Sequence, residues 1–308
     1  MRLIINADDF GLDIDRDLGI LWGVIRGYIT SVSVIITPQC STIRKILIWI
    51  IRKKASVGIH INLTDKPLVR YDPSELFSIP YKMDRAKFCF WRNALTNTLN
   101  IEKCREEISI QLDQFEKNYR FKPTHIDAHN HCNIFNPLLN ETFQNEARQR
   151  NIPLRIPYEC AAWIPSAWKE YWGCDDLEAF YTRSVDFINM KDQQYSFLFS
   201  HDTELYNYLC VHNGFECGIP FIGSTYGYFR TKEYLIAQLE LIPAEQSVQL
   251  MVHPGFYFPW IKHRTPFSNK DRLDELNALA RFIKRKDCGI KLFNHTLTDI
   301  SDAPNLLS

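Results

Sequence analysis

Four groups of polar side chains combine residue types that can bind a metal or move a proton. They are the Asp8-Asp9 pair, His60 with Asn62, the segment 125–131, and His253. Each group lies at or just after the end of a short apolar run that predicts a β-strand. In parallel α/β folds the carboxyl ends of the strands form the edge where ligands bind. The four groups are therefore expected to meet at one site.

The segment 125–131, His-Ile-Asp-Ala-His-Asn-His, is the strongest of these signals. It places three histidines and Asp127 within seven residues, directly after a predicted strand. Imidazoles commonly ligate transition metals, and carboxylates often orient them from behind. The segment therefore favours metal binding. The alternatives are a solvated histidine-rich loop and a histidine network in the core.

Asp8 and Asp9 are adjacent carboxylates at the end of the first predicted strand. Ionising both carboxylates at once costs free energy unless a cation or hydrogen-bond donors lie nearby. One could bind a metal while the other accepts a proton. Alternatively, Asp9 caps the following helix and Asp8 is solvated. His60 lies inside an apolar run, where a lone histidine is more often a hydrogen-bonded core residue than a ligand.

One carboxylate and two imidazoles leave coordination positions open for water, which is typical of a catalytic metal site. Such a metal polarises a carbonyl and lowers the pKa of its bound water. His253 is then available as an acid, and Arg155 could hold a catalytic aspartate by charge-assisted hydrogen bonds. The alternatives are a loop histidine before a Pro-Gly turn and a structural ion pair.

The elements that would position these residues alternate between strands and helices. Strands are predicted at 3–6, 31–37, 57–63, 124–128, 153–156, 195–199, 248–252 and 290–293. Helices are predicted at 14–27, 42–53, 101–118, 136–150, 232–241 and 270–286. This alternation predicts a mostly parallel sheet, either doubly wound or closed into a barrel. Two long stretches, 64–100 and 158–192, fit poorly and predict insertions over the catalytic face or peripheral packing.

Composition limits the partners and the compartment. The 308 residues include 36 Lys and Arg against 36 Asp and Glu, so the formal net charge is zero. That balance argues against nucleic acid or an anionic membrane as the main partner. The longest apolar run, 46–51, is too short for a membrane span, and the first residues lack a signal-peptide core. The nine cysteines contain no C-x-x-C pair and predict reduced thiols in a cytoplasmic protein.

Taken together, the motifs resemble the YdjC-like carbohydrate deacetylase family, which includes chitooligosaccharide deacetylases. The matching segments are N-A-D-D-F-G at 6–11, G-I-H-I-N-L-T at 58–64, K-P-T-H-I-D-A-H-N-H at 122–131 and V-H-P-G at 252–255. They follow the family's order and spacing over nearly the whole chain. The resemblance implies a distorted (β/α) barrel related to NodB-type polysaccharide deacetylases, with 1–308 as a single catalytic domain.

The resemblance also implies metal-dependent removal of acetyl groups from N-acetylated sugars. It places one divalent ion, Mg²⁺ or Zn²⁺, on Asp9, His60 and His129. Two imidazoles and a carboxylate suit zinc by ligand preference, whereas family usage points to magnesium or a generic divalent ion.

For the reaction itself, the resemblance implies that Asp8 is the base, that Arg155 steadies it, and that His253 is the acid. The remaining polar residues of the motifs are expected to orient ligands or contact substrate; they are Asp127, His125, His131 and Asn62. Two positions depart from the family pattern: Asn133 replaces a further histidine and Ala128 replaces a serine. These changes bear on substrate preference more than on hydrolysis.

Two other functions fit the same residues. One is another barrel metallohydrolase, such as a phosphoesterase, which would need more ligands for a two-metal site. The other is a sugar-binding homologue without turnover. Aromatic side chains in the two insertions could stack on an acetamido sugar or pack a homodimer interface; they are Phe88, Phe90, Trp91, Trp163, Trp168 and Trp172.

Overall fold

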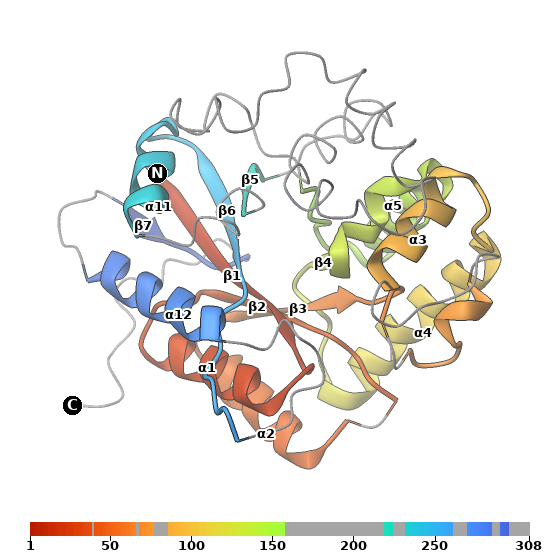
Figure 1. Ribbon diagram of the computed structural model, residues 1–308, viewed down its shortest axis with the longest axis horizontal. Coiled ribbons are helices and arrows are strands. Elements are labelled where there is room, and N and C mark those ends of the chain that lie inside the picture. Colours follow the sequence, from red (N-terminus) through yellow and green to blue (C-terminus); the bar gives the residue numbers. More distant parts are fainter. Residues whose placement is uncertain are drawn as a thin grey trace.

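The strands of the computed structural model form a single parallel sheet. The structure describes residues 1–38, 40–65, 68–76, 86–157, 219–223, 232–260, 270–284 and 290–295. Within them the strand order is β4-β3-β2-β1-β6-β5, with β7 paired to the start of β1. The bounds are β1 (Arg2–Phe10), β2 (Ser31–Val34), β3 (Ser56–Ile61), β4 (Ile126–Ala128), β5 (Phe221–Ile222), β6 (Ser247–Val252) and β7 (Lys291–Leu292). The sheet curls into a half-barrel (Figure 1), which confirms the predicted barrel-type α/β fold.

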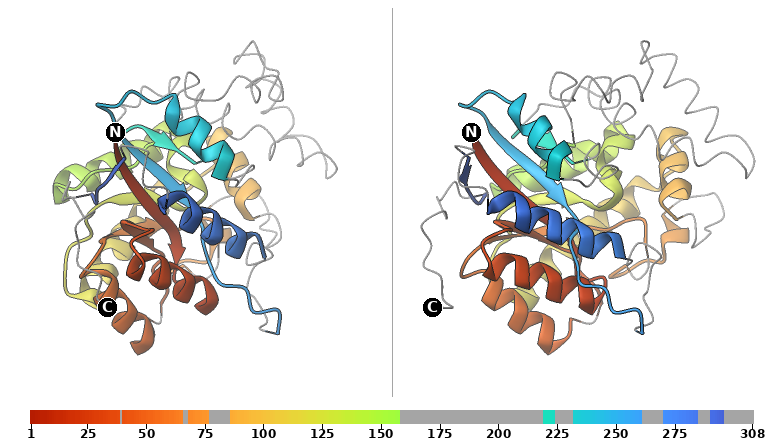
Figure 2. Two further views of the ribbon diagram at one scale, coloured as in Figure 1. Left: turned by 90° about the vertical axis from the view of Figure 1, so that its left-hand side faces the viewer. Right: turned by 60° about the vertical axis from the view of Figure 1, so that its left-hand side comes forward.

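Helices cover the outer side of this sheet. They are α1 (Ile14–Ile25), α2 (Thr42–Ile51), α4 (Ile101–Tyr119), α5 (Pro137–Arg150), α11 (Lys232–Glu240) and α12 (Lys270–Ile283), whereas α3 (Ala86–Leu95) packs against the segment that follows β4. Neighbouring helices pack in the order α5, α4, α2, α1, α12, α11. This order follows that of the strands, as expected when each helix crosses over between parallel strands. Figure 2 shows α1 beside both α2 and α12.

Side-chain caps define where several helices begin. Ser41 accepts a hydrogen bond from Arg44 N (3.2 Å) at the start of α2, and Asn100 accepts one from Lys103 N (3.1 Å) at the start of α4. Asn136 does the same for α5, and each oxygen satisfies a backbone donor that has no partner within its helix. The helix starts therefore agree with the sequence prediction to within a residue.

The two faces of the first four strands differ in chemistry, although both are buried. Successive strand residues point to opposite faces. One face is apolar and packs in the core with the helices; it carries Leu3, Ile5, Ala7, Val32, Val34, Val57, Ile59, Ile61, Ile126 and Ala128. Apart from Ile4, the buried alternate positions of these strands are polar or glycine: Asn6, Asp8, Ser31, Ser33, Ser56, Gly58, His60 and Asp127. The register sets Ser33 beside Gly58 and His60 beside Asp127. The polar groups thus share the inner face of the half-barrel.

The first strand is longer than the sequence predicts. The apolar pattern ends at Asn6, but backbone pairing continues to Phe10. The register with β2 shifts between Ala7 and Phe10, and Asp9 has a φ of 66°. Such a bulge breaks the alternation of side chains. It allows the consecutive residues Asp8 and Asp9 to serve the same site.

Several other secondary-structure elements differ from the prediction or lie outside the described residues. The predicted strand 153–156 makes one isolated bridge, from Leu154 to Ile126. Helix α3 lies in the stretch 64–100, where the sequence predicted no regular element. The short strand β5 was also not predicted. The predicted strand 195–199 and the insertion 158–192 lie outside the described residues, and the single domain over 1–308 stays a prediction.

The prediction that aromatic residues near 64–100 face a sugar or a dimer interface is wrong for Phe90 and Trp91. Both side chains are fully buried. The Trp91 ring stacks on Phe135 with 4.4 Å between centroids, and its Nε1 donates to Asn130 O (3.1 Å). These rings are core residues because α3 packs against the segment that follows β4. The Phe88 side chain, Trp163, Trp168 and Trp172 lie outside the described residues.

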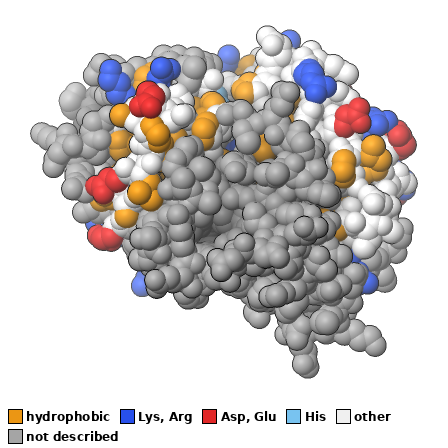
Figure 3. All heavy atoms as spheres, turned by 90° about the horizontal axis from the view of Figure 1, so that it is seen from above, with side chains coloured by type: hydrophobic (Ala, Val, Ile, Leu, Met, Phe, Trp, Pro, Cys, Tyr) orange, Lys and Arg blue, Asp and Glu red, His pale blue; other side chains and the backbone are white. Residues whose placement is uncertain are grey.

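The surface offers little further evidence about partners. Among the described residues, no helix is both long and apolar enough to cross a membrane. On the face seen from above (Figure 3), the described hydrophobic, basic and acidic side chains are interspersed.

Candidate active site

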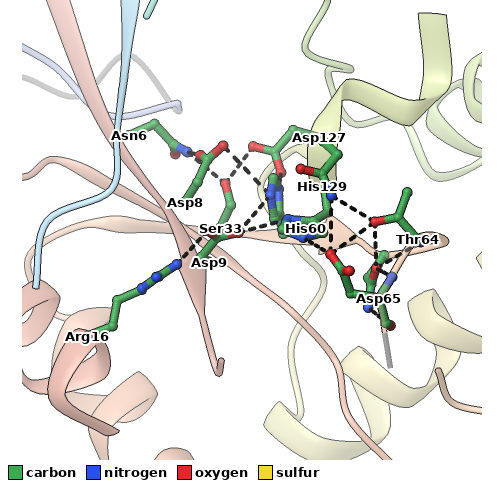
Figure 4. Close-up of polar contacts among 12 residues, drawn as sticks. Asn6, Asp8, Asp9, Arg16, Ser33, His60, Thr64, Asp65, Asp127 and His129 are labelled. Carbon is green, nitrogen blue, oxygen red and sulfur yellow. Dashed lines mark hydrogen bonds and ion pairs between the residues drawn. The ribbon is translucent and has the colours of Figure 1, made fainter. Parts of the chain in front are cut away.

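The carboxyl ends of β1, β3 and β4 bring Asp9, His60 and His129 together (Figure 4). His60 Nε2 lies 3.3 Å from Asp9 Oδ1, and His129 Nδ1 lies 2.9 Å from the same oxygen. The two imidazole rings are edge to face, with 5.3 Å between centroids. The three residues come from segments far apart in sequence, so the fold alone assembles them.

This group fits a divalent cation. One ligand atom from each residue lies within 4.8 Å of the other two, and all three residues are buried. Among the described residues, the buried Asp9 Oδ1 accepts no well-aligned hydrogen bond even from the two nearby imidazole nitrogens, whereas Oδ2 accepts one from Arg16 Nη1 (2.5 Å). A carboxylate oxygen between two imidazole nitrogens is a donor set suited to zinc and related ions. Asp9 does not cap the next helix, because Asp13 occupies that position.

Each imidazole has a second carboxylate on its other nitrogen. His60 Nδ1 is hydrogen-bonded to Asp127 Oδ1, and His129 Nε2 is hydrogen-bonded to Asp65 Oδ2 (2.7 Å). Carboxylates in this position fix the orientation of a metal-binding histidine and raise its basicity. Both histidines are therefore held with one nitrogen directed at Asp9.

Asp8 lies beside this group and is held by Arg155. The guanidinium donates from Nη1 to Oδ1 (2.8 Å) and from Nη2 to Oδ2 (2.6 Å). Asn6 Nδ2 also donates to Oδ1 (2.6 Å). Asp8 Oδ2 lies 3.7 Å from His60 Nε2. The carboxylate is thus fixed next to the candidate metal position without belonging to the Asp9 group.

Burial and charge shift the pKa values of these groups in different directions. Burial raises the pKa of Asp8, although Arg155 opposes it. For Asp127, burial acts upward, but Arg155 and His60 outweigh it and hold the pKa below the usual range. Burial disfavours a charged His60, yet Asp127 and Asp8 raise its pKa to about 10. Asp8 is therefore the carboxyl group of this cluster that most readily takes up a proton.

His253 follows β6, and its side chain is half-buried. Its carbonyl oxygen accepts from Arg272 Nη1 (3.2 Å), and Gly255 N donates to Arg272 O (3.1 Å). These bonds tie the loop to α12. Burial holds the pKa of His253 well below its usual value, although Asp9 acts in the opposite direction. The imidazole is therefore neutral at neutral pH.

Three other predicted residues have no ligand atom in the Asp9 group. His125 is hydrogen-bonded to Ser33 and Thr124 behind the site. His131 is buried, with its ring 5.7 Å from that of Phe221. Asn62 builds the loop that carries Asp65: its Oδ1 accepts from Asp65 N (3.0 Å) and its Nδ2 donates to Asp65 O (2.6 Å). This is an Asx-type turn.

Sequence reasoning missed four residues that hold the site: Asp65, Arg16, Ser33 and Asn6. Asp65 directly follows the motif 58–64, and Asn6 is the first residue of the motif 6–11, so the position of each beside known site residues was a usable signal. Ser33 and Arg16 carry no comparable signal, because their roles depend on contacts across the fold.

Fold and site together define an α/β half-barrel protein with a candidate metal centre at the carboxyl edge of its sheet. The chain belongs to the family described as YdjC-like protein, whose model matches residues 2–282. It is 31% identical over 137 residues to a carbohydrate deacetylase from Mus musculus, which covers 44% of this chain and 43% of that protein. It is 29% identical over 195 residues to a chitooligosaccharide deacetylase from Salmonella paratyphi B, covering 60% and 74%.

A crystal structure supports the fold over a longer range. It is that of a candidate cellobiose-phosphate cleavage protein from Enterococcus faecalis V583, with a TM-score of 0.62 and 20% identity. The match covers 96% of this chain and 97% of the other. By contrast, the alignment with the mouse relative spans less than half of that protein's length.

Proposed function

We propose that this protein hydrolyses the acetamide group of N-acetylated sugars or short oligosaccharides of the N-acetylglucosamine type, with one bound divalent metal ion. The observation that carries the proposal is the buried group of Asp9, His60 and His129, with Asp8 fixed beside it. A metal site and a separate carboxylate base are the two parts that amide hydrolysis by water needs. The names of the mammalian and bacterial relatives support the same substrate class.

Asp9, His60 and His129 would hold the metal, which when bound would polarise the acetyl carbonyl and lower the pKa of a water molecule. Asp8 accepts the proton as the water attacks, and burial supports this role by raising its pKa. Arg155 binds both oxygens of Asp8 and keeps the carboxylate from rotating away. Asp127 and Asp65 orient the two imidazoles from behind.

His253 is the proposed acid that protonates the departing amine. Because burial lowers its pKa, the imidazole enters the reaction neutral. It therefore has to take up a proton during turnover before it can protonate the amine. In this sequence of steps Asp8 and His253 act in succession, as base and then acid.

The metal is proposed to be Zn²⁺ or Mg²⁺. Two imidazole nitrogens favour zinc, because magnesium prefers a shell of oxygen ligands. Magnesium is the alternative because Asp9 and the neighbouring Asp8 supply carboxylate oxygens, the ligands that this ion prefers. Stripping the ion with a chelator and restoring each ion separately at matched concentration decides between them.

Acetate release from N-acetylglucosamine oligomers tests the activity. We expect metal-dependent release that stops on chelation and returns on metal addition. Phosphate release from sugar phosphates without acetate release would favour a phosphoesterase instead. Binding of the oligomer without any product would favour a sugar-binding homologue that has lost turnover.

The acid role of His253 has its own test. His253→Ala should slow hydrolysis of the amide, whose amine leaves poorly without a proton. An activated acetyl ester needs less protonation, so the variant should hydrolyse the ester at near the wild-type rate. An equal loss on both substrates would contradict this role.

The cytoplasmic location and a homodimer also remain predictions. Cell fractionation tests the location, and light scattering tests the dimer.

A further inference from the structure

His125 and Ser33 have no part in the proposed chemistry, yet both are buried directly behind His60. We propose that they are positioning residues: a one-way chain of hydrogen bonds from Thr124 through His125 and Ser33 to Asp127 fixes which nitrogen of His60 faces the metal. The inference rests on the proposed function, since it concerns the same metal site. It gives a role to the first histidine of the segment 125–131.

The argument begins at the hydroxyl of Ser33, which makes three close contacts. Asn6 Nδ2 lies 2.7 Å from Ser33 Oγ, His125 Nε2 lies 2.9 Å away, and Asp127 Oδ2 lies 2.6 Å away. A serine hydroxyl has one proton to donate and can accept two hydrogen bonds. The Asn6 amide nitrogen can only donate. Asp127, ion-paired with Arg155 at 3.1 Å, can only accept. The Ser33 proton therefore points to Asp127.

This assignment fixes the protons of His125. Because Ser33 gives its proton to Asp127, His125 Nε2 must donate to Ser33. A neutral imidazole then accepts at Nδ1, where Thr124 Oγ1 lies 2.9 Å away and can donate. His125 is thereby held as the tautomer with its proton on Nε2.

The same logic continues toward the metal position. Asp127 uses Oδ2 for Ser33 and Oδ1 for His60 Nδ1, so the proton of His60 is held on Nδ1. When a metal displaces the proton of Nε2, the lone pair of that nitrogen is the one directed at the Asp9 group, whose Oδ1 lies 3.3 Å away. Every bond from Thr124 onward points toward Asp127, and His60 Nδ1 donates to the other oxygen of the same carboxylate, so both arms end on Asp127. If Asp127 instead carried a proton and donated it to Nδ1, the proton of His60 would have to sit on Nε2, the nitrogen that the metal needs.

Gly58 gives this chain its path through the sheet. The His125 ring crosses over β3 to reach Ser33 on β2, and the register sets Ser33 beside Gly58. A Cβ at position 58 would lie 2.3–2.5 Å from three atoms of the His125 ring. The ring also stacks on His295, with 3.7 Å between centroids. The His125 ring is therefore packed on both faces, by Gly58 and by His295. This packing fixes its position, as an orienting group requires.

Zinc affinity of the full-length protein, measured by competition with a chromophoric chelator, tests the chain without recourse to turnover. Ser33→Ala and His125→Phe should each weaken zinc binding about tenfold, the lower end of the usual cost of losing a group behind a ligand. His125→Gln should bind zinc nearly as wild type does, because its amide nitrogen can still donate to Ser33. Ser31→Ala is the matched control. Ser31 is buried on the same strand and face, and its hydroxyl has no hydrogen-bond partner among the described residues.

Thermal unfolding of the metal-free variants shows whether each one folds. If His125→Phe does not fold, the zinc affinities of Ser33→Ala and Ser31→Ala are compared instead. The proposal is wrong if Ser33→Ala binds zinc like Ser31→Ala. It is also wrong if His125→Gln binds as weakly as a folded His125→Phe, since packing alone would then explain the loss. A wild-type protein that binds no divalent ion overturns both this inference and the proposed function. Intact zinc binding with this variant pattern, but without acetate release, overturns only the function.

Discussion

The two histidine–carboxylate pairs of the site contain the same chemical groups in opposite settings. His60 and Asp127 face each other on adjacent strands, with side chains 2% and 0% exposed. His129 and Asp65 lie on segments that follow strands, with side chains 11% and 32% exposed. We call them the sheet pair and the rim pair.

The difference lies in what holds each pair. Asp127 of the sheet pair is also bound by Ser33 and Arg155, so its position is fixed from several directions. His129 of the rim pair precedes Asn130 and His131, whose φ angles are 53° and 50°. Non-glycine residues adopt such angles at a cost and persist in them only where the surroundings require it. We therefore propose that the sheet pair contributes more to metal retention than the rim pair does.

The largest expected effect concerns Asp8, which lies on the side of the sheet pair. Asp8→Asn keeps the shape of the side chain but cannot accept a proton. We expect turnover to fall about 10²- to 10⁴-fold, the usual scale for a general base, while zinc affinity stays near that of wild type. Acetate release and chelator competition on one preparation measure both. Loss of the metal together with turnover would show that chemistry and metal retention are not separated as proposed.

The second prediction uses the pH dependence of metal binding. Burial disfavours protonated His60 and His129, but neighbouring carboxylates raise their pKa values to about 10 and about 9 in the metal-free protein. At neutral pH both imidazoles are therefore protonated, and the metal must displace about two protons. Affinity should fall about 100-fold for each unit of pH below about 9.

Calorimetry in two buffers of different ionisation enthalpy counts the released protons, and a count near zero would contradict these pKa directions.

The stability of the metal-free protein should change with pH in the opposite direction to its metal affinity. Because the folded pKa values exceed the unfolded value, the metal-free protein gains stability from these pairs below about pH 6.5 and loses it as the pH rises through 9 to 10. Thermal unfolding in the presence of a chelator measures this trend.

The third prediction breaks the sheet pair. Asp127→Asn removes the charge behind His60 and one partner of Arg155. Zinc affinity should fall about 10- to 100-fold, because the ring loses both its orientation and its added basicity. Unchanged metal content and unchanged turnover would remove Asp127 from the site.

The fourth prediction makes the matching change in the rim pair. Asp65→Asn should weaken zinc binding less than tenfold or so, since a partly exposed pair contributes less than a buried one. The informative quantity is the ratio between the two variants under one set of conditions. If Asp65→Asn loses more affinity than Asp127→Asn, the assignment of metal retention to the sheet pair is reversed.

Much of the fold was predictable, because alternating apolar runs and capped helices are local signals. The strand ends also pointed to Asp8, Asp9, His60 and His129, whose ligand and base roles remain proposals. What the local pattern did not contain was the bulge in β1, since the apolar run stops at Asn6 while the backbone pairing continues. Similarly, the turns at Asn130 and His131 could not be predicted from polar residues alone.

The supporting residues were harder to find for a physical reason. Ser33 contacts Asp127 across 94 positions of sequence, and its serine neighbour Ser31 on the same face makes no hydrogen bond among the described residues. Nothing in their residue type separates the two. The difference comes from register: Ser33, not Ser31, lies beside Gly58, over which the His125 ring passes.

Gly58 has a consequence for how the sequence can change over evolutionary time. A side chain at 58 and an imidazole at 125 exclude each other, so alanine at 58 becomes tolerable only after position 125 has become smaller. Once alanine is in place, a return to histidine at 125 is blocked until glycine comes back. The two positions therefore form an epistatic ratchet. Related chains that carry a side chain at position 58 should therefore lack histidine at position 125.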